Sequence, residues 1–165
     1  MARVEERVHI HRPLDHVWSV LTDWESQSEW MADAHSVTVT SPHRAGLGVT
    51  IRVPTDIALG LVVMDEMQVT EWVVRRKIGV RHTGRFIKGT GAFELQPTVT
   101  PAGGGGTLFT WSEQIDAPLG RLGDAILRYT AVPYVARVFR RSLRALKAVA
   151  ERDDSRPPEM AVDTS

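Results

Sequence analysis

Hydrophobic and polar residues alternate in several short stretches of the chain. From Arg3 to His11, Val4, Val8 and Ile10 fall on one parity and charged or polar residues on the other. A period of two predicts a strand with one buried face. The same period returns within residues 36–39, 49–53, 77–83, 91–95 and 108–115, and residues 59–74 are mostly of types that favour strands. Successive short strands favour antiparallel pairing, so we expect a meander.

Helical spacing appears directly after the first predicted strand. Pro13 suits a first helical turn, and apolar residues repeat at helical intervals from Leu14 to Leu21. Ser26 and Glu29 then have the spacing of a capping box. We therefore expect two short helices between the first strand and the meander.

The longest helical pattern covers residues 119–151. It is apolar along one face, and its arginines fall largely on the opposite side, as in a helix that lies on a sheet. Pro133 lacks an amide hydrogen, which predicts a kink or a break. Residues 1–152 are expected to form one domain. Residues 153–165 are polar, contain Pro157 and Pro158 and lack periodicity, so a disordered tail is expected.

Composition narrows the possible environments and partners. Twenty basic residues balance twenty acidic ones, so no global field attracts nucleic acid. No apolar run is long enough for a membrane span, and cysteine is absent. We expect a cytoplasmic monomer or homodimer without integral membrane contact, cofactor or metal.

Several local sequences resemble one known superfamily. They are Val8–Asp23 (VHIHRPLDHVWSVLTD), Trp30 and Met31, Gly89–Leu95 (GTGAFEL) and Gly106–Trp111 (GTLFTW). In this order the chain resembles the START/birch-pollen-allergen-like (SRPBCC) superfamily, its polyketide cyclase/dehydrase branch in particular. The resemblance covers residues 3–151. It implies an α+β helix-grip fold: a curved antiparallel sheet of about seven strands around the long C-terminal helix, with a cavity for hydrophobic molecules.

Strand parity selects the side chains that face such a cavity. A one-residue slip would invert any strand, and a packed core uses the same residue types, so core packing remains open for each aromatic residue. Trp30 and residues of the terminal helix join the set as further contacts. The expected ligand-binding residues are Trp30, Ile51, Val53, Met67, Val80, His82, Phe93, Phe109, Trp111, Glu113, Tyr134 and Val138.

Three polar residues share the parity of these apolar neighbours: Asp65, His82 and Glu113. Such groups are able to abstract a proton α to a ketone and to protonate a leaving hydroxyl. We favour a plainer interpretation, in which they lie near strand ends or pair with an arginine, namely Arg52, Arg81 or Arg85.

Other chemistry lacks a starting point. His9 and His11 have the spacing of some zinc ligands, but they alternate with Val8 and Ile10 and so belong on the outer face. The glycines at 103–106 lack the Gly-Lys-Ser/Thr of a phosphate loop and are expected to form a hairpin tip. No G-x-S-x-G elbow is present.

We are left with three hypotheses. The leading one is a protein that binds a small hydrophobic or polyketide-like ligand between sheet and terminal helix. The second is a polyketide aromatase/cyclase or dehydrase that acts in the same cavity. The third is a protein-interaction domain whose interior is a filled core.

Overall fold

The computed structural model describes residues 2–58, 60–116 and 120–152. The predicted tail, 153–165, lies outside the described residues. The elements in chain order are β1 (Ala2–Ile10), α1 (Leu14–Thr22), the 3-10 helix η1 (Glu25–Glu29), β2 (Thr38–Val39), β3 (Thr50–Ala58), β4 (Leu61–Val73), β5 (Lys77–His82), β6 (Gly89–Val99), β7 (Gly105–Ile115) and α2 (Gly120–Glu151).

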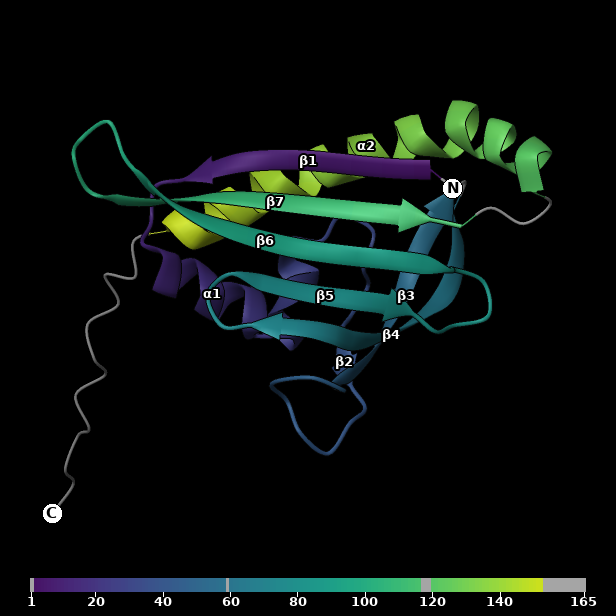
Figure 1. The fold of residues 1–165 in the computed structure, drawn as a ribbon, viewed down its shortest axis with the longest axis horizontal. Coiled ribbons are helices and arrows are strands. Elements are labelled where there is room, and N and C mark those ends of the chain that lie inside the picture. Colours follow the sequence, from purple (N-terminus) through teal and green to yellow (C-terminus); the bar gives the residue numbers. More distant parts are fainter. Residues whose placement is uncertain (1, 59, 117–119, 153–165) are drawn as a thin grey trace, which may run out of the picture.

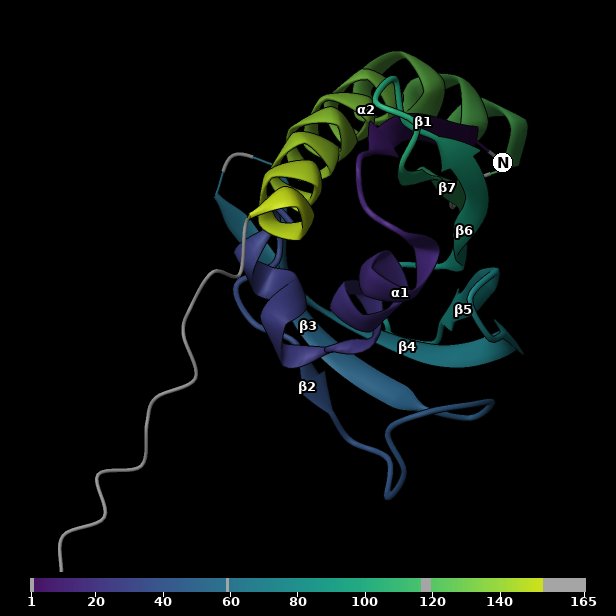
Figure 2. The ribbon, with the colours of Figure 1, turned by 90° about the vertical axis from the view of Figure 1, so that its left-hand side faces the viewer.

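The strands form one seven-stranded antiparallel sheet in the order β1-β7-β6-β5-β4-β3-β2. Neighbours in sequence pair with each other, except that β1 closes the far edge against β7 (Figure 1). The sheet curls, and α1 and α2 lie on its inner side (Figure 2). The predicted α+β helix-grip fold with a curved seven-stranded sheet is confirmed.

The predicted hairpin tip is displaced by two residues. Gly105 pairs with Val99 and Gly106 with Thr98, so these two glycines belong to β7. The turn is closed instead by Thr100, whose backbone N–H donates to the Gly104 carbonyl at 2.8 Å.

The two short helices lie where their patterns predicted them. Val17 and Leu21 bury the inner face of α1. The second helix, η1, is a single 3-10 segment, and the predicted capping box does not form at its start. Ser26 donates its hydroxyl hydrogen to the Asp23 carbonyl at 2.9 Å, and η1 has no side-chain cap.

The terminal helix is continuous, so of the predicted kink or break at Pro133 the break does not occur. α2 runs from Gly120 to Glu151 with Pro133 inside it. Beyond Pro133 its inner face carries Phe139, Leu143 and Leu146, all buried. The exposed arginines lie on the other side, as predicted.

The C-terminal end of α2 contacts α1 and the segment between β1 and α1. Glu151 accepts hydrogen bonds from the His11 backbone N–H at 2.6 Å and from Lys147 at 2.7 Å. The His16 ring donates from Nε2 to the Ala150 carbonyl at 2.9 Å. The last of these contacts satisfies a carbonyl at the helix end that has no partner within the helix.

Two apolar clusters flank the middle of the sheet. One packs under α2 around Trp30, Phe109 and Phe139, and the other lies between η1 and the β3–β5 strands around Trp24, Ile51 and Ile78. Within the described ranges, no helix is long and apolar enough to cross a membrane.

Candidate functional site

A cavity of about 310 Å³ lies between the concave face of the sheet and the middle of α2. Side chains from β3, β4, β5, β6, β7 and α2 line it, together with η1 and the loops after η1 and β5. The volume is at the lower end of the range of about 300–1,000 Å³ for small-molecule sites.

The structure brings most of the sequence-selected residues to this cavity. Ten of the twelve line it: Ile51, Val53, Met67, Val80, His82, Phe93, Trp111, Glu113, Tyr134 and Val138. Trp30 and Phe109 do not. Both are fully buried in the cluster under α2. They therefore follow the alternative considered for each aromatic residue, which was core packing.

Aromatic rings form one wall of the cavity. Trp111 stacks on Phe139 of α2 with ring centroids 3.9 Å apart and planes inclined by 18°. Phe93, the cross-strand partner of Trp111, meets it edge-on at 5.3 Å. The stack of Trp111 on Phe139 attaches α2 to β7, and the rings present a flat apolar surface to the cavity.

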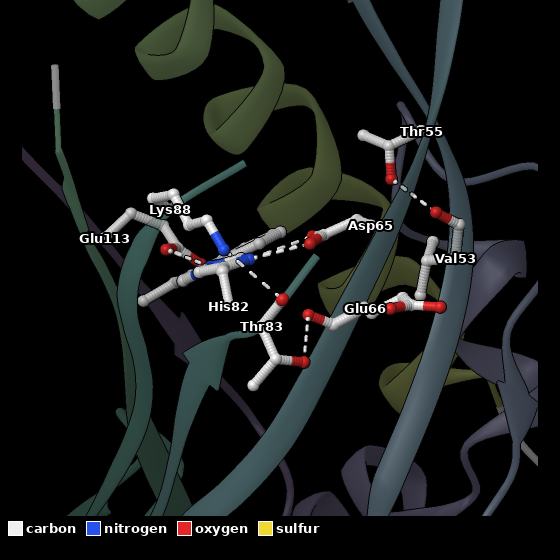
Figure 3. Close-up of polar contacts among 9 residues, drawn as sticks. Val53, Thr55, Asp65, Glu66, His82, Thr83, Lys88 and Glu113 are labelled. Carbon is white, nitrogen blue, oxygen red and sulfur yellow. Dashed lines mark hydrogen bonds and ion pairs between the residues drawn. The ribbon is translucent and has the colours of Figure 1, made fainter. Parts of the chain in front are cut away.

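Asp65, His82 and Glu113 converge at the polar end of the cavity (Figure 3). His82 Nδ1 lies 2.9 Å and 3.0 Å from the two carboxylate oxygens of Asp65, and Nε2 lies 3.0 Å from Glu113 Oε2. Asp65 is 4% and His82 8% exposed. We call these three residues the His82 array.

The plainer interpretation placed these residues near strand ends or beside Arg52, Arg81 or Arg85. His82 is the last residue of β5, but within the described residues none of the three pairs with these arginines. Arg52 pairs with Glu66 at 2.8 Å, on the opposite face of the sheet from Asp65. The Arg85 guanidinium lies 5.8 Å from the centroid of the Phe86 ring. The three residues of the His82 array therefore pair with one another.

The array fixes the charge of His82. Carboxylates only accept hydrogen bonds, so an imidazole that faces one with each ring nitrogen is best satisfied when both nitrogens carry hydrogen. Burial lowers the pKa of His82, but the hydrogen bonds to Asp65 and Glu113 outweigh it and raise the pKa to about 10. At neutral pH the array is an imidazolium between two carboxylates.

A glycine of β6, Gly91, allows His82 to reach Glu113. His82 pairs with Gly89, while Gly91 pairs with Glu113 on the next strand. A Cβ atom on Gly91 would lie 2.4 Å from Glu113 Oε1, which accepts the Trp111 indole N–H at 3.2 Å. The absence of a side chain at position 91 leaves room for the Glu113 carboxylate to reach the His82 ring across β6.

Asp33 is a cavity residue that the sequence did not reveal. It lies in the loop after η1, outside any periodic segment. Burial, opposed by a backbone hydrogen bond at Asp33 itself and reinforced by the charge of Glu113, raises the pKa of Asp33 to about 6. A carboxyl group with such a pKa exchanges its proton close to neutral pH.

The mouth of the cavity is apolar and open to solvent. Phe86, in the loop between β5 and β6, is 66% exposed although it contributes to the lining. Ile57 on β3 and Tyr134 on α2 are also exposed lining residues. Lys88, which lies beside them, donates to the Thr83 carbonyl at 3.4 Å.

The histidines considered as zinc ligands have other surroundings. His9 is exposed, and its carbonyl accepts a hydrogen bond from Lys147 at 2.6 Å. His11 Nδ1 lies 3.7 Å from Glu151. In the part of the chain that the structure describes, no three His, Cys, Asp or Glu side chains are grouped as a metal site.

Comparisons with known proteins agree with this geometry. A family model described as "Polyketide cyclase / dehydrase and lipid transport" matches residues 1–151. No curated protein has a sequence similar enough to match.

Solved structures show the same fold. A protein from Thermus thermophilus superimposes with a TM-score of 0.74 at 16% identity, over 90% of this chain and 97% of the other. The Zhui aromatase/cyclase from a Streptomyces species superimposes with a TM-score of 0.69 at 20% identity, over 92% of this chain and 94% of the other. A START superfamily protein from Mycobacterium smegmatis superimposes with a TM-score of 0.63 at 17% identity, over 90% of this chain and 92% of the other.

Proposed function

The chain belongs to the polyketide cyclase/dehydrase and lipid transport family, and we propose that it binds a small, largely apolar molecule in the cavity between the sheet and α2. The observation that carries the proposal is a cavity of about 310 Å³ with an aromatic wall at Trp111 and Phe93. Every 100 Å² of apolar ligand surface removed from water contributes about 2.5 kcal/mol.

The exposed rim supports the same function. Phe86, Ile57 and Tyr134 leave apolar surface in water at the mouth of an apolar cavity. Exposed apolar surface that continues into a pocket is typical of a binding site. The cavity also argues against the third hypothesis, which required a filled interior.

Tryptophan fluorescence and thermal unfolding test the proposal together. Trp24 and Trp111 line the cavity, so 1,8-dihydroxyanthraquinone, a planar polyketide-like probe, is expected to quench tryptophan emission at saturation. A ligand at 100 times its Kd stabilises a folded protein by about 2.7 kcal/mol, or about 5–11 °C in Tm for a chain of this size. Absence of both effects, with this and other apolar probes, would contradict the proposal.

A matched pair of variants locates the binding. Val138→Phe places a larger side chain into the cavity from α2, whereas Val73→Phe makes the same substitution at the exposed end of β4. Quenching is expected to weaken in the first variant and persist in the second. Equal binding by both would place the probe elsewhere on the protein.

A second function, acid–base catalysis in the same cavity, is favoured by Asp33. The doubly paired His82 imidazolium holds its proton too tightly to act as a base at neutral pH. A pKa of about 6 suits Asp33 to give or take a proton in a cyclase or dehydrase reaction. Turnover that survives Asp33→Asn, Asp65→Asn and Glu113→Gln together would refute this role.

A further inference from the structure

The side-chain donors that line the cavity are already engaged with the protein. Gln27 donates to the Leu21 carbonyl at 2.7 Å, and Thr55 donates to the Val53 carbonyl at 3.1 Å. Trp24 donates to the Arg44 carbonyl, while Trp111 and His82 donate to the carboxylates of the array. The remaining side-chain donors of the lining, Lys88 and the Tyr134 hydroxyl, lie at the exposed mouth.

The acceptors of the cavity are not exhausted in this way. A carboxylate offers about four acceptor positions, and those of Asp65 and Glu113 are only partly used by His82 and Trp111. The Asp33 carboxylate accepts a hydrogen bond from its own backbone and, within the described residues, has no further hydrogen-bond or ion-pair partner. The interior therefore offers a ligand many more acceptors than donors.

Charge reinforces this imbalance. Around the cavity, five carboxylates face one imidazolium and one ammonium: Asp33, Asp56, Asp65, Glu113 and Asp116 against His82 and Lys88. Asp56 shares an exposed contact with His35 at 3.2 Å, and its negative charge still acts on Asp33. Lys88 is an exposed lining residue at the mouth. A ligand anion would approach several carboxylates in a site where water screens them poorly.

We propose that the cavity selects an apolar ligand that carries a hydrogen-bond donor, above all a protonated amine, and rejects carboxylates. The donor is placed between Asp33 and the His82 array while the apolar part rests against Trp111 and Phe93. This inference rests on the proposed function, because it specifies which apolar molecules the cavity accepts.

Four probes of one shape test the selectivity: 2-naphthylmethylammonium, 2-naphthol, naphthalene and 2-naphthoate, each titrated by calorimetry at pH 7.5. The ammonium probe is expected to bind about tenfold or more tighter than naphthalene, as for one added hydrogen bond to a charged group. Naphthol is expected to fall between them, and naphthoate to bind more weakly than naphthalene.

Asp33→Asn tests whether Asp33 recognises the amine. The variant keeps the shape of the side chain and removes the charge, so the ammonium probe is expected to lose about tenfold in affinity, with naphthalene unchanged. The amide also supplies a donor, so naphthoate is expected to bind more tightly than to the original protein. Asp15→Asn, at an exposed carboxylate on α1 that pairs with Arg75, is the matched control and is expected to leave all four affinities unchanged.

The outcomes separate this inference from the function beneath it. If no probe binds, including naphthalene, the proposed binding function fails. If naphthalene binds but naphthoate binds as tightly as the ammonium probe or more tightly, the proposed binding function is kept and the proposed selectivity is wrong. An unchanged ammonium affinity in Asp33→Asn would overturn the role given to Asp33.

Discussion

The substitution Gly91→Ala tests how the His82 array is held together. The new Cβ would lie 2.4 Å from Oε1 and 2.9 Å from Cδ of Glu113, so the carboxylate must leave its position. It then loses its hydrogen bonds with His82 at 3.0 Å and with Trp111 at 3.2 Å. The backbone of Gly91 is not in the left-handed region, so alanine causes no backbone strain of its own.

The cost follows from these two contacts. A hydrogen bond between charged groups contributes about 1.5–3 kcal/mol and a neutral donor about 1 kcal/mol, so Gly91→Ala is expected to lower the free energy of unfolding by about 2–4 kcal/mol. In a chain of this size that corresponds to about 5–15 °C in Tm. The pKa of His82 is expected to fall as well, because one of its two carboxylate partners is displaced.

Urea unfolding of four proteins measures the effect: the original chain, Gly91→Ala, Glu113→Ala and the double variant. Without the Glu113 carboxylate there is nothing for the new methyl group to displace, so the second substitution is expected to cost about 0.5 kcal/mol or less. An NMR titration of His82 follows its pKa in parallel. Strictly additive costs in the cycle, with an unchanged His82 pKa, would refute the reasoning.

Three further predictions concern stability. Between about pH 4 and pH 6 the folded protein keeps a proton on Asp33 that the unfolded chain releases. Asp33→Asn is therefore expected to be about 1–3 kcal/mol more stable than the original protein at pH 7, and no more stable below pH 4. A loss of stability at pH 7, measured by urea unfolding, would contradict this prediction. Between pH 6.5 and about 10, His82 keeps its proton only in the folded protein. The free energy of unfolding is therefore expected to fall by about 1.4 kcal/mol per pH unit between pH 7 and 9, relative to that of His82→Gln. If the unfolding free energies of the two proteins change with pH in parallel, this prediction is wrong. Phe139→Ala removes the ring that stacks on Trp111. The substitution is expected to lower the free energy of unfolding by about 3–5 kcal/mol and to shift the emission of Trp111. A loss of under about 1 kcal/mol would show that this contact does not hold α2 on the sheet.

Periodicity was sufficient to predict the fold because the sheet and α2 are built from amphipathic segments. The same parity brought His82 and Glu113 to the concave face, since alternation decides which side of a strand a residue occupies. The pairing partners were out of reach, because they depend on register. Asp65 lies two residues before Met67, the direct partner of His82, and Glu113 is separated from His82 by β6.

The features missed have local physical causes. Asp33 belongs to a loop, where no period marks an inward side chain. Trp30 was expected at the ligand, but it packs against Trp111 and Phe93 behind the cavity wall, and parity does not distinguish a wall from the core behind it. Pro133 was expected to kink or break the terminal helix, and α2 continues through it without a break.

Gly91 of β6 is the sequence signal that points to the array. Gly91 is the cross-strand partner of Glu113 and lines the cavity, so β6 has no side chain at the position that faces the Glu113 carboxylate. A glycine inside a central strand weakens the strand and is typical of a site where another group approaches closely.

A crystal structure of the protein with 2-naphthylmethylammonium tests the central claim most directly. Our account predicts the naphthalene rings against Trp111 and Phe93 beneath α2, with the nitrogen between Asp33 and the carboxylates that flank His82. A saturated crystal in which this space stays empty, or in which the molecule binds only on the outer surface, would contradict it.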